Sequence, residues 1–171
     1  MADSVIRVRF RFRTVDNLNN DYEGFCVDDV NVTGILTPQY TISGFIKNDC
    51  NLPVSGVVVD ANNGGGSAPA DANGRYEIAV NYGWSGTVTP SRLNYTFEPN
   101  LIGYNNVLTD IPDQNYVAVY IYDLNRNCTI GWGDVAVFAE NWLQTGNGIA
   151  GDFDADNYVD FIDFAEFALI W

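Results

Sequence analysis

The chain has 171 residues, of which 47% are apolar, 14% aromatic and 18% charged, a globular composition sufficient for one ordinary domain or two small ones. Its formal net charge of −14 disfavours nucleic acids and anionic membrane surfaces as partners. Histidine is absent, which excludes Ser-His-Asp and Cys-His catalytic triads and histidine-ligated zinc.

Residues 1–38 predict two β-strands. Apolar and arginine side chains alternate over residues 6–13, and a second alternating run covers residues 25–32. Two strands do not form a stable domain alone, so they must pair with the rest of the chain, with another chain or with upstream sequence. With the motif Tyr22-Glu-Gly-Phe-Cys-Val-Asp-Asp-Val30, residues 1–38 resemble the last two strands of a jelly-roll domain. Residues 5–32 offer a surface for self-association.

Residues 39–121 predict a β-sandwich of seven short strands separated by turn-forming residues. The expected strands are Tyr40–Lys47, Val54–Asp60, Arg75–Val80, Trp84–Thr89, Tyr95–Glu98, Ile102–Tyr104 and Tyr116–Tyr122. The three glycines at 64–66 are expected to form a mobile loop tip.

Several motifs in this segment resemble those of carboxypeptidase regulatory-like modules. They include Leu52-Pro-Val-Ser-Gly-Val-Val-Val59 and Asp71-Ala-Asn-Gly-Arg-Tyr76. The resemblance covers roughly half the chain. It implies an Ig- or transthyretin-like sandwich that serves as a spacer or accessory module in a secreted multidomain protein.

The C-terminal segment is duplicated at an offset of 29 residues. Residues 123–134 align with residues 152–163, and the apolar residues that follow each stretch align as well. Each copy reads as an oxygen-rich, EF-hand-type loop followed by an amphipathic helix. Calcium favours about six to eight oxygen ligands, which a loop of this type presents at positions 1, 3, 5, 7, 9 and 12. Residues 123–171 also carry nine acidic side chains and one basic side chain.

The spacing therefore predicts two calcium sites, the second stronger than the first. In the first loop the expected ligands are Asp123, Asn125, Asn127, the carbonyl group of Thr129, water in place of a Gly131 side chain, and Asp134. In the second loop they are Asp152, Asp154, Asp156, the carbonyl group of Tyr158, Asp160 and Asp163. Five carboxylates in one loop repel one another, so order there should depend on metal. Ile130 and Val159, both at position 8, are expected where paired loops touch.

Both loops have Asp instead of Glu at position 12, and no helical pattern precedes either loop. Residues 122–171 instead resemble a type I dockerin, a duplicated loop–helix module that binds calcium and docks onto cohesin modules. The resemblance implies that positions 10 and 11 contact the partner, and here they are Trp132, Gly133, Phe161 and Ile162. These residues are bulkier than in many dockerins, which puts a standard cohesin in doubt as the partner. The alternative is that they fill the small core of the module.

Cys26, Cys50 and Cys128 allow three single-bridge pairings. A bridge between Cys50 and Cys128 would lock the sandwich to the first calcium loop, and three unpaired thiols are the alternative. No carboxylate pair has a spacing that indicates glycoside hydrolysis, so we expect no catalysis. Trp84 is expected in the core, although an exposed Trp84 could stack on a sugar.

We therefore expect a non-catalytic segment of a secreted bacterial protein, of the kind that assembles for polysaccharide degradation. Its partner would be a cohesin-like module or a neighbouring chain. The sequence starts without the basic head and apolar stretch of a signal peptide and has no apolar run of the about 20 residues that a membrane span needs. A self-assembling extracellular subunit with a calcium-stiffened tail is one alternative, and a carbohydrate-binding module is another.

Overall fold

The computed structural model describes residues 37–170. The chain divides into two units, Met1–Ile35 and Leu36–Trp171, and the second contains every element below. The two strands expected within residues 6–32, the self-association surface 5–32 and Cys26 lie outside the described residues.

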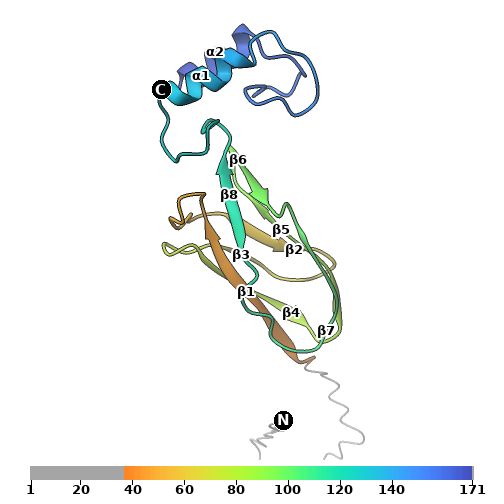
Figure 1. Ribbon diagram of the computed structural model, residues 1–171. Helices are drawn as coiled ribbons and strands as arrows, with labels where there is room; N and C mark the ends of the chain where they lie inside the picture. The colour runs from red at the N-terminus through yellow and green to blue at the C-terminus, as the bar shows by residue number, and fades with distance from the viewer. Residues whose placement is uncertain (1–36, 171) are drawn as a thin grey trace, which may run out of the picture. The chain divides into compact units, whose positions relative to one another are not determined.

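Eight strands form two four-stranded sheets that pack face to face as a sandwich (Figure 1). The strands are β1 (Gln39–Lys47), β2 (Val58–Ala61), β3 (Ser67–Pro69), β4 (Arg75–Asn81), β5 (Trp84–Ser91), β6 (Tyr95–Glu98), β7 (Ile102–Val107) and β8 (Tyr116–Tyr120). One sheet has the order β4-β1-β8-β6 and the other the order β3-β2-β5-β7. The β1–β8 pair is parallel, and the other paired strands in these sheets are antiparallel.

The prediction of a mainly β sandwich is confirmed, but the prediction of seven strands is wrong by one. The missed strand, β3, is three residues long and contains a proline, so it has no alternating pattern to reveal it. The strand expected from Val54 begins only at Val58, because Gly56 adopts a left-handed backbone with φ of 71°. The strand expected to reach Tyr122 ends at Tyr120.

The glycine tract before β3 lies only partly at a loop tip: Gly64 is exposed in the turn between β2 and β3, whereas Gly66 packs against the sandwich. The amide of Gly66 donates a hydrogen bond of 2.9 Å to the carbonyl oxygen of Ala79 on β4. A Cβ atom at Gly66 would lie 2.8 Å from that same oxygen, so only glycine allows this close approach. The tract therefore helps to close the two sheets along the β3–β4 side.

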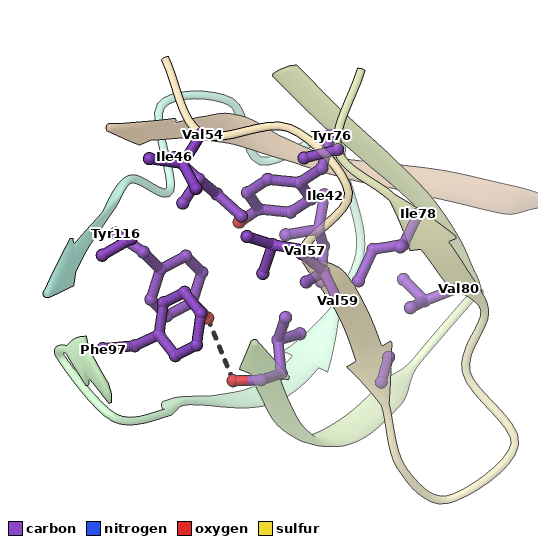
Figure 2. Close-up of a cluster of buried hydrophobic side chains, with 14 of the residues drawn as sticks. Ile42, Ile46, Val54, Val57, Val59, Tyr76, Ile78, Val80, Phe97 and Tyr116 are labelled. Atoms are coloured by element: carbon purple, nitrogen blue, oxygen red, sulfur yellow. Dashed lines mark hydrogen bonds between the residues drawn. The ribbon is translucent and has the colours of Figure 1, made fainter. Parts of the chain in front are cut away.

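Strict alternation along the strands directs one set of side chains into the core between the sheets. In β4 every second residue is buried, the pattern of a strand with one wet face. Figure 2 shows Tyr76 and Tyr116 pointing into this cluster, where their hydroxyl groups donate to the carbonyl oxygens of Gln114 at 2.6 Å and Val88 at 3.0 Å. The remaining core members are aliphatic for the most part: Ile42, Ile46, Val54, Val57, Val59, Ala61, Ala70, Ile78, Val80, Val88, Val107 and Ala118, with Trp84 and Phe97.

Two short helices, α1 (Trp132–Glu140) and α2 (Phe161–Ala168), follow the sandwich in the chain. Helices of nine and eight residues are marginal alone and need packing. A stack of three phenylalanine rings, Phe138, Phe153 and Phe167, supplies it, with ring centroids 5.9 to 6.2 Å apart. The first helix ends at Glu140. Leu143 has a left-handed φ of 61°, and its amide donates to the carbonyl of Val159.

The helical segment, residues 122–170, is tied to the sandwich by covalent and non-covalent contacts. A disulfide joins Cys50 to Cys128, which confirms the bridge over the alternative of three unpaired thiols. Aromatic contacts continue across the junction, with Tyr122 lying 5.5 Å from Tyr120 and 4.6 Å from Phe153 between ring centroids. No helix within residues 37–170 has the length and apolar character needed to cross a membrane.

A candidate metal centre in the duplicated loops

The two acidic loops have the same backbone conformation. Loop 1 is defined as residues 123–134 and loop 2 as residues 152–163. In loop 1 the residues at positions 4 and 6 have left-handed φ values of 57° and 67°, and in loop 2 the same positions have 60° and 71°. The helices that follow begin at Trp132 and Phe161, 29 residues apart. The sequence repeat is therefore a structural repeat.

Five hydrogen bonds recur at equivalent positions in both loops. In each loop the carboxylate at position 12 accepts from the backbone amides of positions 3 and 9, at 3.1 and 2.8 Å in loop 1 and 3.3 and 2.9 Å in loop 2. The carboxylate at position 1 accepts from the amide of position 6. The side-chain oxygens at positions 3 and 5 accept from the amides two residues later. These bonds curl each loop around its own side-chain oxygens.

The position-12 carboxylates, Asp134 and Asp163, are 0% and 1% exposed. Each also lies at the third residue of its helix, where an acidic side chain caps the helix start by accepting the N-cap amide. A buried carboxylate is costly unless hydrogen bonds or a cation compensate its charge. These two aspartates thus combine helix capping with the place from which a calcium loop supplies its last ligand.

Loop 2 brings three carboxylates together. Asp152, Asp154 and Asp156 each present an oxygen, and these oxygens lie within 4.8 Å of one another. Desolvation, together with the charges of Asp156, Asp163 and Asp152, raises the pKa of Asp154 above its ordinary value. Proximity of like charges without a cation is unfavourable.

One oxygen distinguishes the two loops. In loop 1, Oδ1 of Asp123 accepts from the amide of Asn127 at 3.0 Å. In loop 2, Oδ1 of the equivalent Asp152 is buried and has no hydrogen-bond partner, and it is the sole such side-chain atom among the described residues. A buried carboxylate oxygen with no donor, beside two further carboxylates, fits a divalent cation.

A short antiparallel bridge holds Tyr158, whose carbonyl is the expected position-7 ligand of loop 2. Thr145 pairs with Tyr158, and the carbonyls of Asn157 and Val159 accept from the amides of Gly146 and Leu143. The bonds across this bridge therefore use the carbonyls on either side of Tyr158 and not the carbonyl of Tyr158 itself.

The backbone of Val159, at position 8 of loop 2, pairs with the segment after α1 and not with Ile130, its equivalent in loop 1. The carbonyl and amide of Val159 are both engaged with the segment after α1, at 2.8 Å to Leu143 and 3.1 Å to Gln144. Val159 is fully buried there, whereas Ile130 is only partly buried. Loop 2 is therefore joined by backbone hydrogen bonds to the turn after α1, and a contact between the side chains of Ile130 and Val159 stays a prediction.

The residues at positions 10 and 11 are exposed. Trp132 is 80% exposed, Phe161 71% and Ile162 55%, so the alternative in which they fill the core is wrong. Gly133 is also exposed, but a Cβ atom there would clash with Nδ2 of Asn125, so its small size serves loop 1 itself.

Apolar hollows lie beside these residues along the two helices. One of about 270 Å³ is lined by Trp132, Val135, Phe164, Phe167 and Ala168. A second of about 450 Å³ is lined by Val135, Phe138, Ala139, Trp142, Phe161 and Phe164. The two share Val135 and Phe164, so one apolar surface, the helical face, spans both helices.

Trp84 does not offer a sugar-stacking surface. It is 6% exposed, and its indole Nε1 donates to the carbonyl of Asn62 at 3.0 Å. This confirms its expected place in the sandwich core.

Comparison with known proteins gives no family assignment. No family model matches the sequence, and no curated protein matches it. Two solved structures with some likeness are chains from mutant type II cohesin–X–dockerin complexes of Acetivibrio cellulolyticus, at TM-scores of 0.39 and 0.37 and identities of 18% and 19%. Each match covers 76% of this chain and 94% of the other. A 9R-lipoxygenase from Cyanothece PCC8801 matches over 51% of this chain and 18% of its own, with 16% identity and a TM-score of 0.33.

Sequence reasoning proposed the disulfide that holds loop 1 but missed its second anchor, Arg126. Arg126, at position 4, donates to Asp49 at 2.7 Å and to Glu98 at 3.0 Å, both on the sandwich. The sequence does show that Arg126 is the one basic residue of 123–171. It does not reveal the partners, because they lie 77 and 28 residues away.

Proposed function

We propose that residues 122–171 form a calcium-dependent docking module and that the rest of the chain is a non-catalytic accessory segment. The ligands would be Asp123, Asn125, Asn127, Asp134 and the carbonyl of Thr129 in loop 1, and Asp152, Asp154, Asp156, Asp160, Asp163 and the carbonyl of Tyr158 in loop 2. When bound, calcium supplies a divalent charge that neutralises clustered carboxylates.

The unpartnered Oδ1 of Asp152 carries this proposal. The structure gives it neither a donor nor solvent, while Asp154 and Asp156 present further oxygens beside it. Such an arrangement costs free energy in the protein alone and becomes favourable when a cation is held there. Loop 2 has five carboxylates to the two of loop 1, which supports the stronger site in loop 2.

The helical face supports a docking role. Its exposed aromatic residues, Trp132 and Phe161, begin the two helices directly after the calcium loops. An ordered loop fixes where its helix starts, because the position-12 carboxylates Asp134 and Asp163 also accept the N-cap amides of the two helices. Metal binding would thereby fix the helical face for a cohesin-type module or a neighbouring chain.

The Cys50–Cys128 disulfide supports an extracellular location, since such bonds persist in oxidising compartments. We accordingly propose that the chain belongs to a secreted bacterial protein. The resemblance of the helical segment to dockerins and of the sandwich to carboxypeptidase regulatory-like modules points the same way.

Calorimetric titration of chelator-stripped protein with calcium, with far-UV circular dichroism before and after, tests the proposal. We expect two ions to bind with a gain of helical signal. The variant Asp152→Ala/Asp163→Ala should lose the loop 2 ion, whereas Asp60→Ala/Glu140→Ala, which removes two exposed charges outside the loops, should bind as the wild type does. Absence of binding to the wild-type protein would refute the calcium site and the docking role that depends on it.

A further inference from the structure

Loop 1 is anchored to the sandwich at two positions where loop 2 is not. Position 4 of loop 1 is Arg126, whose guanidinium binds the carboxylates of Asp49 and Glu98. Position 6 is Cys128, bonded to Cys50. The equivalent residues of loop 2 are Ala155, which has no functional group, and Asn157.

The disulfide falls on a residue with an unfavourable backbone conformation. Cys128 has φ of 67°, in the left-handed region where a Cβ atom crowds the neighbouring carbonyl. Calcium loops usually have glycine at this position for that reason. Loop 2 has Asn157 there, a residue type that tolerates the left-handed region, whereas cysteine does not share that tolerance.

The conformation of Cys128 in turn positions the first ligand of loop 1. Its amide donates to Oδ2 of Asp123 at 2.6 Å, while the amide of Asn127 donates to Oδ1 at 3.0 Å. If Cys128 relaxed to a right-handed or extended conformation, its amide would turn away from Asp123. The position-1 carboxylate would then lose one of the two bonds that orient it.

The other end of the bridge is rigid. Cys50 lies in a turn between β1 and β2 in which Oδ1 of Asn48 accepts from the amides of Cys50 at 3.1 Å and Leu52 at 2.9 Å. The carbonyl of Asn48 also accepts from the amide of Asn51. A turn fixed in this way can hold Cys128 against its own backbone preference.

We propose that the Cys50–Cys128 bridge acts as a redox control on calcium binding by loop 1, because it holds Cys128 in the left-handed conformation that the loop requires. A dithiol reductant would supply two electrons and two protons, release the two thiols and itself close to a cyclic disulfide. Loop 1 would then bind calcium about tenfold more weakly, while loop 2, which has no such bridge, would keep its affinity. This inference rests on the proposed calcium function.

The test compares calcium titrations of three proteins that all retain Cys26: the oxidised wild type, Cys50→Ser/Cys128→Ser and Cys50→Ser/Cys128→Gly. The serine pair should lose high-affinity binding of one ion. The glycine variant should regain it without any bridge, because glycine adopts the left-handed conformation without the Cβ penalty. Binding by loop 2 in the same molecules shows that the helical segment is folded.

The outcomes separate the two proposals. Wild-type affinity for both ions in the serine pair, or no recovery in the glycine variant, would overturn the redox control and leave the calcium function standing. A single ion bound by the oxidised wild type at loop 2 would also overturn it. No ion bound by the oxidised wild type would refute the calcium function itself.

Discussion

The same substitution at the first position of the two loops should have opposite effects on stability without calcium. Asparagine is nearly the same shape as aspartate but offers one acceptor oxygen and one NH₂ donor. At Asp152, its oxygen can keep the bond from the amide of Asn157, now 3.1 Å, while its NH₂ group replaces the unpartnered oxygen and faces Asp154 and Asp156. At Asp123 both oxygens already accept backbone amides, so one amide would face an NH₂ group.

The magnitudes follow from the hydrogen bonds gained and lost. Asp123→Asn leaves one partly buried backbone amide without an acceptor, which lowers the free energy of unfolding by about 1 kcal/mol with or without calcium. Asp152→Asn removes an uncompensated charged oxygen and adds donors to carboxylates, a gain of about 1 kcal/mol in chelator. In calcium at about 100 times the dissociation constant, however, the wild type gains about 2.7 kcal/mol at loop 2, which the variant forgoes.

Urea unfolding followed by the helical circular dichroism signal, in chelator and in calcium, measures both effects. Asp152→Asn should therefore be more stable than the wild type in chelator and less stable in calcium, whereas Asp123→Asn should be less stable in both. If Asp152→Asn destabilised the protein in chelator, the unpartnered oxygen would not be the feature that prepares loop 2 for a cation.

Three further outcomes follow from the same contacts. Trp132→Ser/Phe161→Ser should abolish binding of a partner to the helical face without changing calcium affinity. The control Leu93→Ser, at an equally exposed site on the sandwich, should leave partner binding unchanged. A pull-down with the identified partner would measure both. Phe167→Ala should lower the free energy of unfolding by about 3–5 kcal/mol, because it removes the most buried ring of the phenylalanine stack. An unchanged urea midpoint for loss of the helical signal would contradict this packing. Arg126→Ala should lower the free energy of unfolding by about 1 kcal/mol or less in the same assay, because its two ion pairs are partly exposed. A larger decrease in that free energy would show that the two pairs act together as a network.

The repeat was predictable from sequence because its information is local. Each loop is closed by bonds between residues two to ten positions apart, such as those from the amide of Tyr158 to Asp156 and from the amide of Phe153 to Asp163. Oxygen-bearing side chains at fixed spacing therefore encode the loop backbone directly. The strands of the sandwich were likewise visible, because alternation such as that of β4 reports burial residue by residue.

Features that depend on distant partners were not predictable in the same way. β3 pairs with β2 through a three-residue stretch with no pattern of its own, so only the sandwich as a whole makes it a strand. The Asp49 and Glu98 partners of Arg126 come from turns and strand ends that meet only after the sheets form. The exposure of Trp132 and Phe161 was an open alternative, because bulky apolar residues at a helix start fit a core as readily as a surface.

The two loops share one backbone, yet different forces hold them. Loop 1 has two carboxylates, and the sandwich holds its left-handed residues through Arg126 and the Cys50–Cys128 bridge. Loop 2 has five carboxylates, one of them with an unpartnered oxygen, and no link of that kind. Carboxylates raise affinity for a cation but repel one another in its absence, whereas anchors order a loop without that repulsion. Transfer of both anchors to loop 2 would therefore be expected to order loop 2 without calcium. Removal of both anchors from loop 1 would leave that loop with only its two carboxylates, which do not suffice to order it even with calcium.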